Sequence, residues 1–306
     1  MRWSLSCAVK TALAYADVFD YPLSVAEVGQ WLPFLSNPGQ RSIKRCLATS
    51  AREHSGFYFL PKRRSIVARR NLRRQAALEK WRVAGYASWW LRLVPTITLV
   101  GVTGGLAMGN AREKDDIDLI MIVKSRTLWA SRLLATALVE MLGIRRRPGE
   151  QQVKNKICLN MFLAKNYLRL PPDERDFYGA HELLQMKPLW QREDSYKQFL
   201  RANRWVKSFF PDAWSDKISE REFSLPTMKS SYFSLGVYPV TFILRFFEWP
   251  AKIIQLKYMQ RHRTSEVVTD GVLRFHPRDA RPWVKRAFAA RLARYKLPLD
   301  KIFYGR

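Results

Sequence analysis

Two short apolar runs restrict the folds open to this chain more than any other feature of its sequence. Residues 96–102 read TITLVGV and residues 117–123 read IDLIMIV, and apolar, β-branched runs of this length are typical of buried strands. Asp116 and Asp118 stand at the beginning of the second run. Because side chains two apart on a strand point to the same face, we expect these two carboxylates to face one pocket at a strand end.

The residues around this strand end predict a site for a divalent cation. Two carboxylates a few ångströms apart repel each other and favour a cation between them. Carboxylate oxygens select Mg²⁺ or Mn²⁺, which also bridge the oxygens of a triphosphate. Gly104 and Gly105 end the first run, and without side chains they allow backbone N–H groups to approach a phosphate. The alternative is a merely charged strand entry, but Asp118 then interrupts an apolar strand without a packing benefit.

The stretch GGLAMGNAREKDDIDL between the two runs resembles the signature of the DNA polymerase beta nucleotidyltransferase superfamily. Its pattern is a strand, Gly-Gly or Gly-Ser, a short helix, and Asp-x-Asp on the next strand. The spacing is most similar to that of minimal and aminoglycoside-type nucleotidyltransferases, and the resemblance covers roughly residues 96–163. It implies that Gly104 and Gly105 hold a nucleoside triphosphate (NTP), that Asp116 and Asp118 bind Mg²⁺ or Mn²⁺, and that a nucleoside monophosphate passes to an acceptor hydroxyl.

The next predicted strand, residues 157–163 with the sequence ICLNMFL, departs from the family pattern. Active members usually carry a third acid there, which helps to activate the attacking hydroxyl. Strict alternation places Cys158, Asn160 and Phe162 on one face, so Asn160 becomes the third candidate catalytic residue. Its carbonyl oxygen can coordinate a metal, but an amide cannot serve as a general base.

Two explanations follow from this departure. In the first, another side chain supplies the base, with Glu150 and Glu182 as candidates, and His181 stands beside Glu182 near the same pocket. In the second, turnover is weak or lost, and the chain is a nucleotidyltransferase-like module that binds a nucleotide or a nucleic acid. The sequence leaves open the nucleotide preference and the acceptor, which could be RNA, a small molecule or a protein side chain.

The first part of the chain has the order of a winged helix. Ser24 and Glu27 have the spacing of a capping box and open one of three short helices. The strand-like run 56–60, a basic turn at 62–64 and the apolar pair at 66–67 then predict a small hairpin. A winged helix can contact nucleic acid through its third helix or its hairpin, and it can equally serve protein packing alone.

The predicted fold class is α/β (α+β), built on a small mixed sheet. Strand, turn, strand, helix over 127–142, strand, and helix over 178–186 is a compact α/β layout. The predicted organisation is a winged-helix-like domain over 1–68, a connecting helix over 69–94, a nucleotidyltransferase palm domain over 95–192 and a helical C-terminal region over 193–306.

The chain is strongly basic, with 53 Lys and Arg against 26 acidic residues and a formal net charge of +27. Such a charge predicts attraction to polyanions, namely nucleotide phosphates, RNA or DNA, or an anionic membrane surface. The alternative is an enzyme that is generally basic and binds no polymer.

Membrane spans and disulfides are not expected. No run approaches the roughly 20 apolar residues that a span requires, and the closest, 231–244, contains Pro239. We expect a buried helix pair there, while an interfacial helix on lipid, giving peripheral membrane contact through 231–256, is a third hypothesis. The three cysteines are far apart in sequence, which disfavours a disulfide framework or a structural zinc site and predicts a cytoplasmic location.

Overall fold

The computed structural model describes residues 3–219, 241–260, 267–275, 280–298 and 302. Within them the chain is a mixed α/β protein with a six-stranded sheet in the order β6-β3-β4-β5-β8-β7. β4 and β5 are parallel, and the other neighbouring pairs are antiparallel. The strands are β3 (Ile97–Val102), β4 (Ile117–Val123), β5 (Ile157–Ala164), β6 (Lys187–Gln191), β7 (Val267–Val268) and β8 (Val272–Arg274). The predicted α/β class and the mixed sheet are confirmed.

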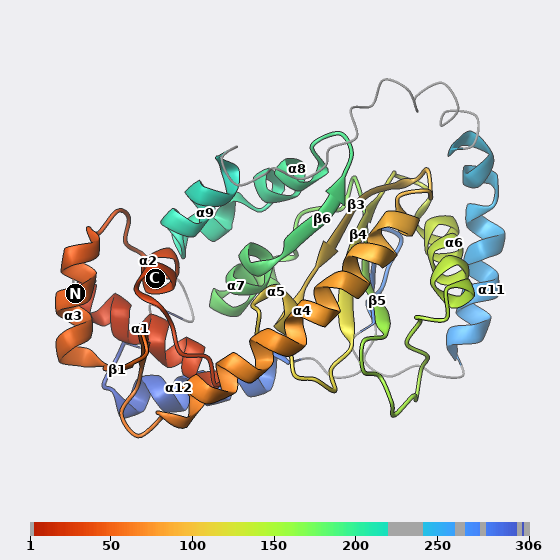
Figure 1. The fold of residues 1–306 in the computed structure, drawn as a ribbon. Coiled ribbons are helices and arrows are strands. Elements are labelled where there is room, and N and C mark those ends of the chain that lie inside the picture. Colours follow the sequence, from red (N-terminus) through yellow and green to blue (C-terminus); the bar gives the residue numbers. More distant parts are fainter. Residues whose placement is uncertain (1–2, 220–240, 261–266, 276–279, 299–301, 303–306) are drawn as a thin grey trace.

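Helices pack on both faces of this sheet (Figure 1). One face meets α4 and α6, with α11 packed on α6, and the other meets a core that includes α7 and the N-terminal helices. The described helices are α1 (Leu5–Val18), α2 (Val25–Gln30), α3 (Gln40–Ser50), α4 (Ser65–Leu91), α5 (Gly104–Ala107), α6 (Leu128–Met141), α7 (Phe177–Gln185), α8 (Ser195–Ala202), α9 (Pro211–Ile218), α11 (Glu248–Gln260) and α12 (Arg281–Arg294), with short 3-10 helices η1 (Pro172–Glu174) and η2 (Arg204–Ser208).

Local signals placed the start of α2 and the end of α6 correctly. The capping box forms, because the Ser24 hydroxyl accepts from the Glu27 N–H at 3.3 Å and a Glu27 carboxylate oxygen accepts from the Ser24 N–H at 2.8 Å. Gly143, at φ +69°, follows the end of α6 as expected, since glycine adopts the left-handed conformation that ends many helices.

The predicted hairpin was misplaced. It consists of β1 (Arg52–His54) and β2 (Phe57–Phe59), and its turn is formed by Ser55 and Gly56, both with positive φ. Such a pair of left-handed residues matches the twist of a two-residue hairpin turn. The apolar pair at 66–67 belongs instead to α4, where it is buried against Phe59.

The sheet also contains strands that the sequence analysis did not predict. β6 follows α7 directly, and β7 and β8 come from the region expected to be helical. The pairing of β8 with β5 joins residues more than a hundred positions apart, so no local sequence pattern predicts it. Of the run 231–244, residues 231–240 lie outside the described part of the chain, so the helix pair predicted there is not assessed.

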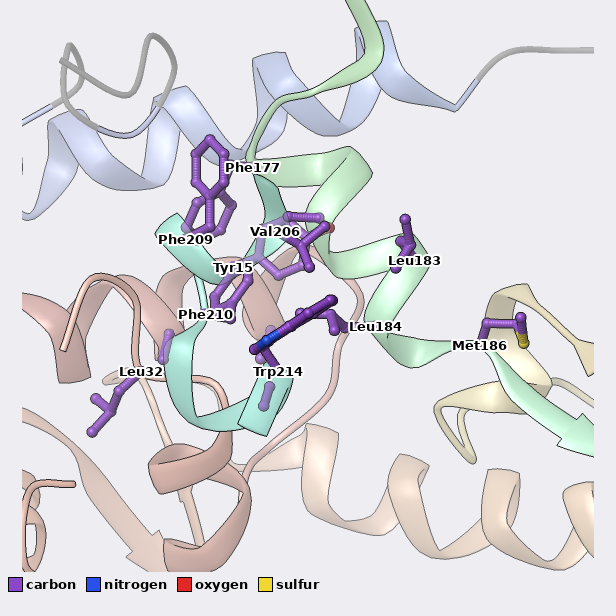
Figure 2. Packing of buried hydrophobic residues seen from close by; sticks show 14 of the residues in the cluster. Tyr15, Leu32, Phe177, Leu183, Leu184, Met186, Val206, Phe209, Phe210 and Trp214 are labelled. Atoms are coloured by element: carbon purple, nitrogen blue, oxygen red, sulfur yellow. The ribbon is translucent and has the colours of Figure 1, made fainter. Parts of the chain in front are cut away.

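The N-terminal helices share one core with the sheet. This core runs from α1, α2 and α3 through α7 and α9 to Leu99, Ile120 and Leu163 of the strands. Figure 2 shows its centre, where Tyr15 of α1 lies among aromatic residues of α7 and of the segment before α9. Among the described helices, none combines the length and hydropathy needed to cross a membrane.

Candidate functional site

Asp116 and Asp118 come together at the beginning of β4, as the alternation predicted. Ile117 and Leu119 enter the core beneath α4 and α6, while Ile120 enters the opposite core. The acidic residues therefore point to the face that carries α7. Ligand atoms of Asp116, Asp118 and Cys158 all lie within 4.8 Å of one another. Two carboxylates and a thiol at this separation can hold one divalent cation.

Gly104 lies directly beside the carboxylate of Asp118. A Cβ at position 104 would stand 3.3 Å from Asp118 Oδ2, and φ there is +64°, a conformation that side chains disfavour. The adjacent Thr103 N–H donates to the Asp118 carbonyl at 3.0 Å, which fixes the turn against the strand. Gly104 and Gly105 line the same pocket as Asp118, whereas Asp116 is not among the residues that line it.

A buried lysine holds the loop that precedes β4. Lys80 of α4 is fully buried, and its ammonium donates to the Glu113 carbonyl at 3.1 Å, to Asn155 Oδ1 at 2.9 Å and to the Asp115 carbonyl. Burying a charge is tolerated only with such complete pairing. The loop that presents Asp116 is therefore fixed to α4, a contact that the sequence did not reveal.

Arg146 is a second cation that the sequence analysis did not single out. It follows α6, and its N–H donates to the Ile157 carbonyl at 2.9 Å, which places it beside β5. Its guanidinium forms an ion pair with Asp116 Oδ2 at 2.5 Å, with the Asp116 side chain 16% exposed. A metal at Asp116 and this guanidinium would share the same carboxylate charge.

The register of β5 changes at Asn160. Asp118 pairs with Cys158, but Ile120 pairs with Met161, so β5 contains one extra residue between these pairs. The expectation that Cys158 and Phe162 share a face is wrong, because Phe162 enters the core beneath α4 and α6. A bulge of this kind re-aims side chains. It leaves both Cys158 and Asn160 on the side of the aspartates, with Asn160 lining the pocket.

The ionised form of Asp118 is disfavoured by its surroundings. Burial raises the pKa of Asp118 to about 7, the charge of Asp116 adds to this, and a hydrogen bond with Cys158 opposes it. Burial and the charge of Asp118 likewise raise the pKa of the Cys158 thiol. A divalent cation would lower these raised pKa values, because it favours ionised ligands.

A pocket of about 350 Å³ opens next to Asp118, between β4, β5, α5 and α7. Glu182 of α7 lines this pocket, and burial raises its pKa to about 7, with Arg281 opposing the shift. The charge of Glu182 also raises the pKa of Asp118. Most of the wall is apolar and includes Met108, Ile120, Met161, Tyr178, Leu183 and Met186.

The two candidate bases, Glu150 and Glu182, lie in different parts of the structure. Glu150 accepts from the Arg147 N–H at 3.0 Å and pairs with Lys156, and it is not among the residues that line the pocket. His181 is buried in the aromatic core, stacked on Tyr15 at 3.9 Å, and burial lowers its pKa. Of the two predicted candidates, Glu182 alone lies at the pocket.

No family model matches the sequence, and no curated protein or solved structure matches the chain. The functional argument therefore depends on the residues and geometry of the site.

Proposed function

We propose that the chain is a metal-dependent nucleotidyltransferase that moves a nucleoside monophosphate from an NTP to an acceptor hydroxyl. The observation that carries the proposal is that Asp118 and the Gly104 turn line one pocket, with Asp116 within 4.8 Å of Asp118. In this proposal the sheet and α7 form a nucleotidyltransferase palm, and α1, α2, α3 and the β1-β2 hairpin form a winged-helix-like unit beside it.

The side chains have distinct tasks in this mechanism. Asp116 and Asp118 would hold Mg²⁺ or Mn²⁺, which would supply positive charge against the phosphates and the pyrophosphate leaving group. Gly104 and Gly105 leave room for the triphosphate against the backbone. Asn160 would offer an amide to the metal or to the nucleotide, and Arg146 holds the Asp116 carboxylate by an ion pair.

Glu182 is the proposed general base. It lines the same pocket as Asp118, and its pKa of about 7 suits proton transfer near neutrality. It would accept the proton of the acceptor hydroxyl as the oxygen attacks the α-phosphate. This placement supplies the acid that β5 lacks.

The proposal is tested by incubating the purified protein with each NTP labelled at the α-phosphate. Mg²⁺ or Mn²⁺ and a mixture of RNA, small hydroxylated molecules and protein are added. We expect label transfer that requires the metal and is absent from Asp116→Asn. If neither transfer nor NTP binding is found with any nucleotide, the proposal is wrong.

A second candidate function is a nucleotide-binding module without turnover. It is favoured by the absence of an acid on β5, where Cys158 and Asn160 stand beside the aspartates. Metal-dependent NTP binding without any label transfer would select this function.

Glu182→Gln is expected to lower kcat by about a hundredfold, because a positioned base contributes on this order or more. The base must be ionised, so wild-type activity falls as the pH drops through a value at or below about 7, since bound cations lower the pKa of a nearby acid. This acidic limb should be missing from the pH profile of the variant. Glu150→Gln is the matched control and should keep both the rate and the limb. Unchanged kcat in Glu182→Gln would remove Glu182 from the mechanism.

A further inference from the structure

Large apolar side chains are exposed along α11 and the helical residues 241–246 that precede it. Seven of them are between 50 and 71% exposed, and we call them the α11 patch. An exposed concentration of this size on one segment generally marks an interaction surface. The α11 patch consists of Phe242, Ile243, Phe246, Phe247, Trp249, Ile254 and Tyr258.

The opposite face of α11 is fixed to α6 by polar contacts. Glu248 accepts from the Trp129 N–H at 3.0 Å and from the Ala130 N–H at 2.9 Å, so it caps the first turn of α6. Gln255 is buried, and its amide donates to the Trp129 carbonyl at 2.8 Å. Figure 1 shows α6 and α11 side by side at the edge of the molecule. Because these contacts fix the rotation of α11, the side chains of the α11 patch point to solvent.

The charge of this segment is basic. Glu248 is the one acidic residue in the sequence of 241–260, and the cap on α6 uses it. Arg245, Lys252 and Lys257 are the basic residues of the same stretch, and Lys252 pairs with the exposed Asp270 at 2.8 Å. The whole chain, which includes this segment, carries a formal net charge of +27. Anionic surfaces are therefore attracted to this side of the protein.

We propose that the α11 patch docks the protein on an anionic lipid surface, with α11 lying in the plane of the interface. Exposed Trp, Tyr and Phe with flanking Lys and Arg are the composition of interfacial helices, whose apolar face enters the acyl boundary. Single-stranded nucleic acid also binds to basic and aromatic residues, but its bases require aromatic rings on which to stack. Ile243, Ile253 and Ile254 occupy the same exposed surface and offer no such platform. Aliphatic side chains suit lipid.

Sedimentation with vesicles tests this docking. Vesicles of phosphatidylcholine alone and with added phosphatidylserine are mixed with the intact protein and with Phe246→Ser/Trp249→Ser. We expect binding that requires phosphatidylserine and that falls by about tenfold or more in the double variant, because two large side chains no longer enter the bilayer. The matched control is Leu72→Ser/Leu78→Ser, which changes equally exposed residues on α4 and should bind as wild type does.

Three outcomes would overturn the proposal. The first is no sedimentation with either vesicle. The second is binding that the double variant retains in full, which would assign the attraction to net charge alone. The third is loss, in the double variant, of binding to single-stranded RNA or of self-association in the absence of lipid, with vesicle binding unchanged. Label transfer does not enter this test, so its result is independent of the proposed enzymatic function.

Discussion

Asp118→Asn is expected to reduce nucleotidyl transfer by about a thousandfold or more while making the protein more stable at pH 8. The loss of activity follows because an amide replaces a charged metal ligand, and each 1.36 kcal/mol of lost transition-state stabilisation lowers the rate tenfold. The gain in stability follows from the position of the carboxylate, which is buried beside Asp116.

The sign of the pH effect is set by the direction of the pKa shift. The pKa of Asp118 rises from 3.8 to about 7 on folding, so the folded state binds more protons than the unfolded state between these values. The contribution of Asp118 to stability is therefore greatest below about pH 4, declines between about pH 4 and 7 and is constant above that range. At pH 8 the penalty on the wild type is on the order of 2–4 kcal/mol, and asparagine, which does not ionise, avoids it.

The two effects need separate measurements. Denaturant unfolding in EDTA at pH 8 and near pH 4 gives the stability difference, which should appear at the higher pH and disappear at the lower. Label transfer with Mg²⁺ gives the activity. Asp216→Asn removes an exposed carboxylate of α9 and should change neither quantity. A variant that keeps its activity, or that gains no stability at pH 8, would contradict the role given to Asp118.

The core of the candidate site was predictable because its geometry is local. Alternation along β4 is enough to place Asp116 and Asp118 on one face, and the glycine turn is only one connection away. The same reasoning failed one strand later. A single extra residue at Asn160 shifted the register of β5, and alternation carried the error on to Phe162.

Long-range contacts explain what the sequence did not reveal. Lys80 reaches the loop before β4 from a helix more than thirty residues earlier, and Arg146 meets Asp116 because β5 lies parallel to β4. Neither residue carries a local pattern that distinguishes it from the other basic residues of a chain with 53 of them. Glu182 was named as one of two candidates, and only the packing of α7 against the sheet separated it from Glu150.

Phe177→Ala is expected to reduce the free energy of unfolding by about 3–5 kcal/mol, the usual cost of removing a large aromatic side chain from a packed core. Phe177 is 2% exposed. Its ring centroid lies 5.4 Å from that of Tyr15, 5.0 Å from Phe210 and 5.3 Å from Phe288, as the packing in Figure 2 illustrates for the first two. The residue therefore joins α1, α7, the segment before α9, and α12.

The shared core also predicts how Phe177→Ala unfolds. Because the N-terminal helices share their core with the sheet, the whole loss should appear as one shifted transition, with circular dichroism and tryptophan fluorescence changing together in urea. Phe246→Ala makes the same substitution at a side chain that is 68% exposed and should change stability by less than about 0.5 kcal/mol. Two separate transitions, with only one of them displaced by Phe177→Ala, would show that the N-terminal helices fold independently and that Phe177 does not couple them to the site.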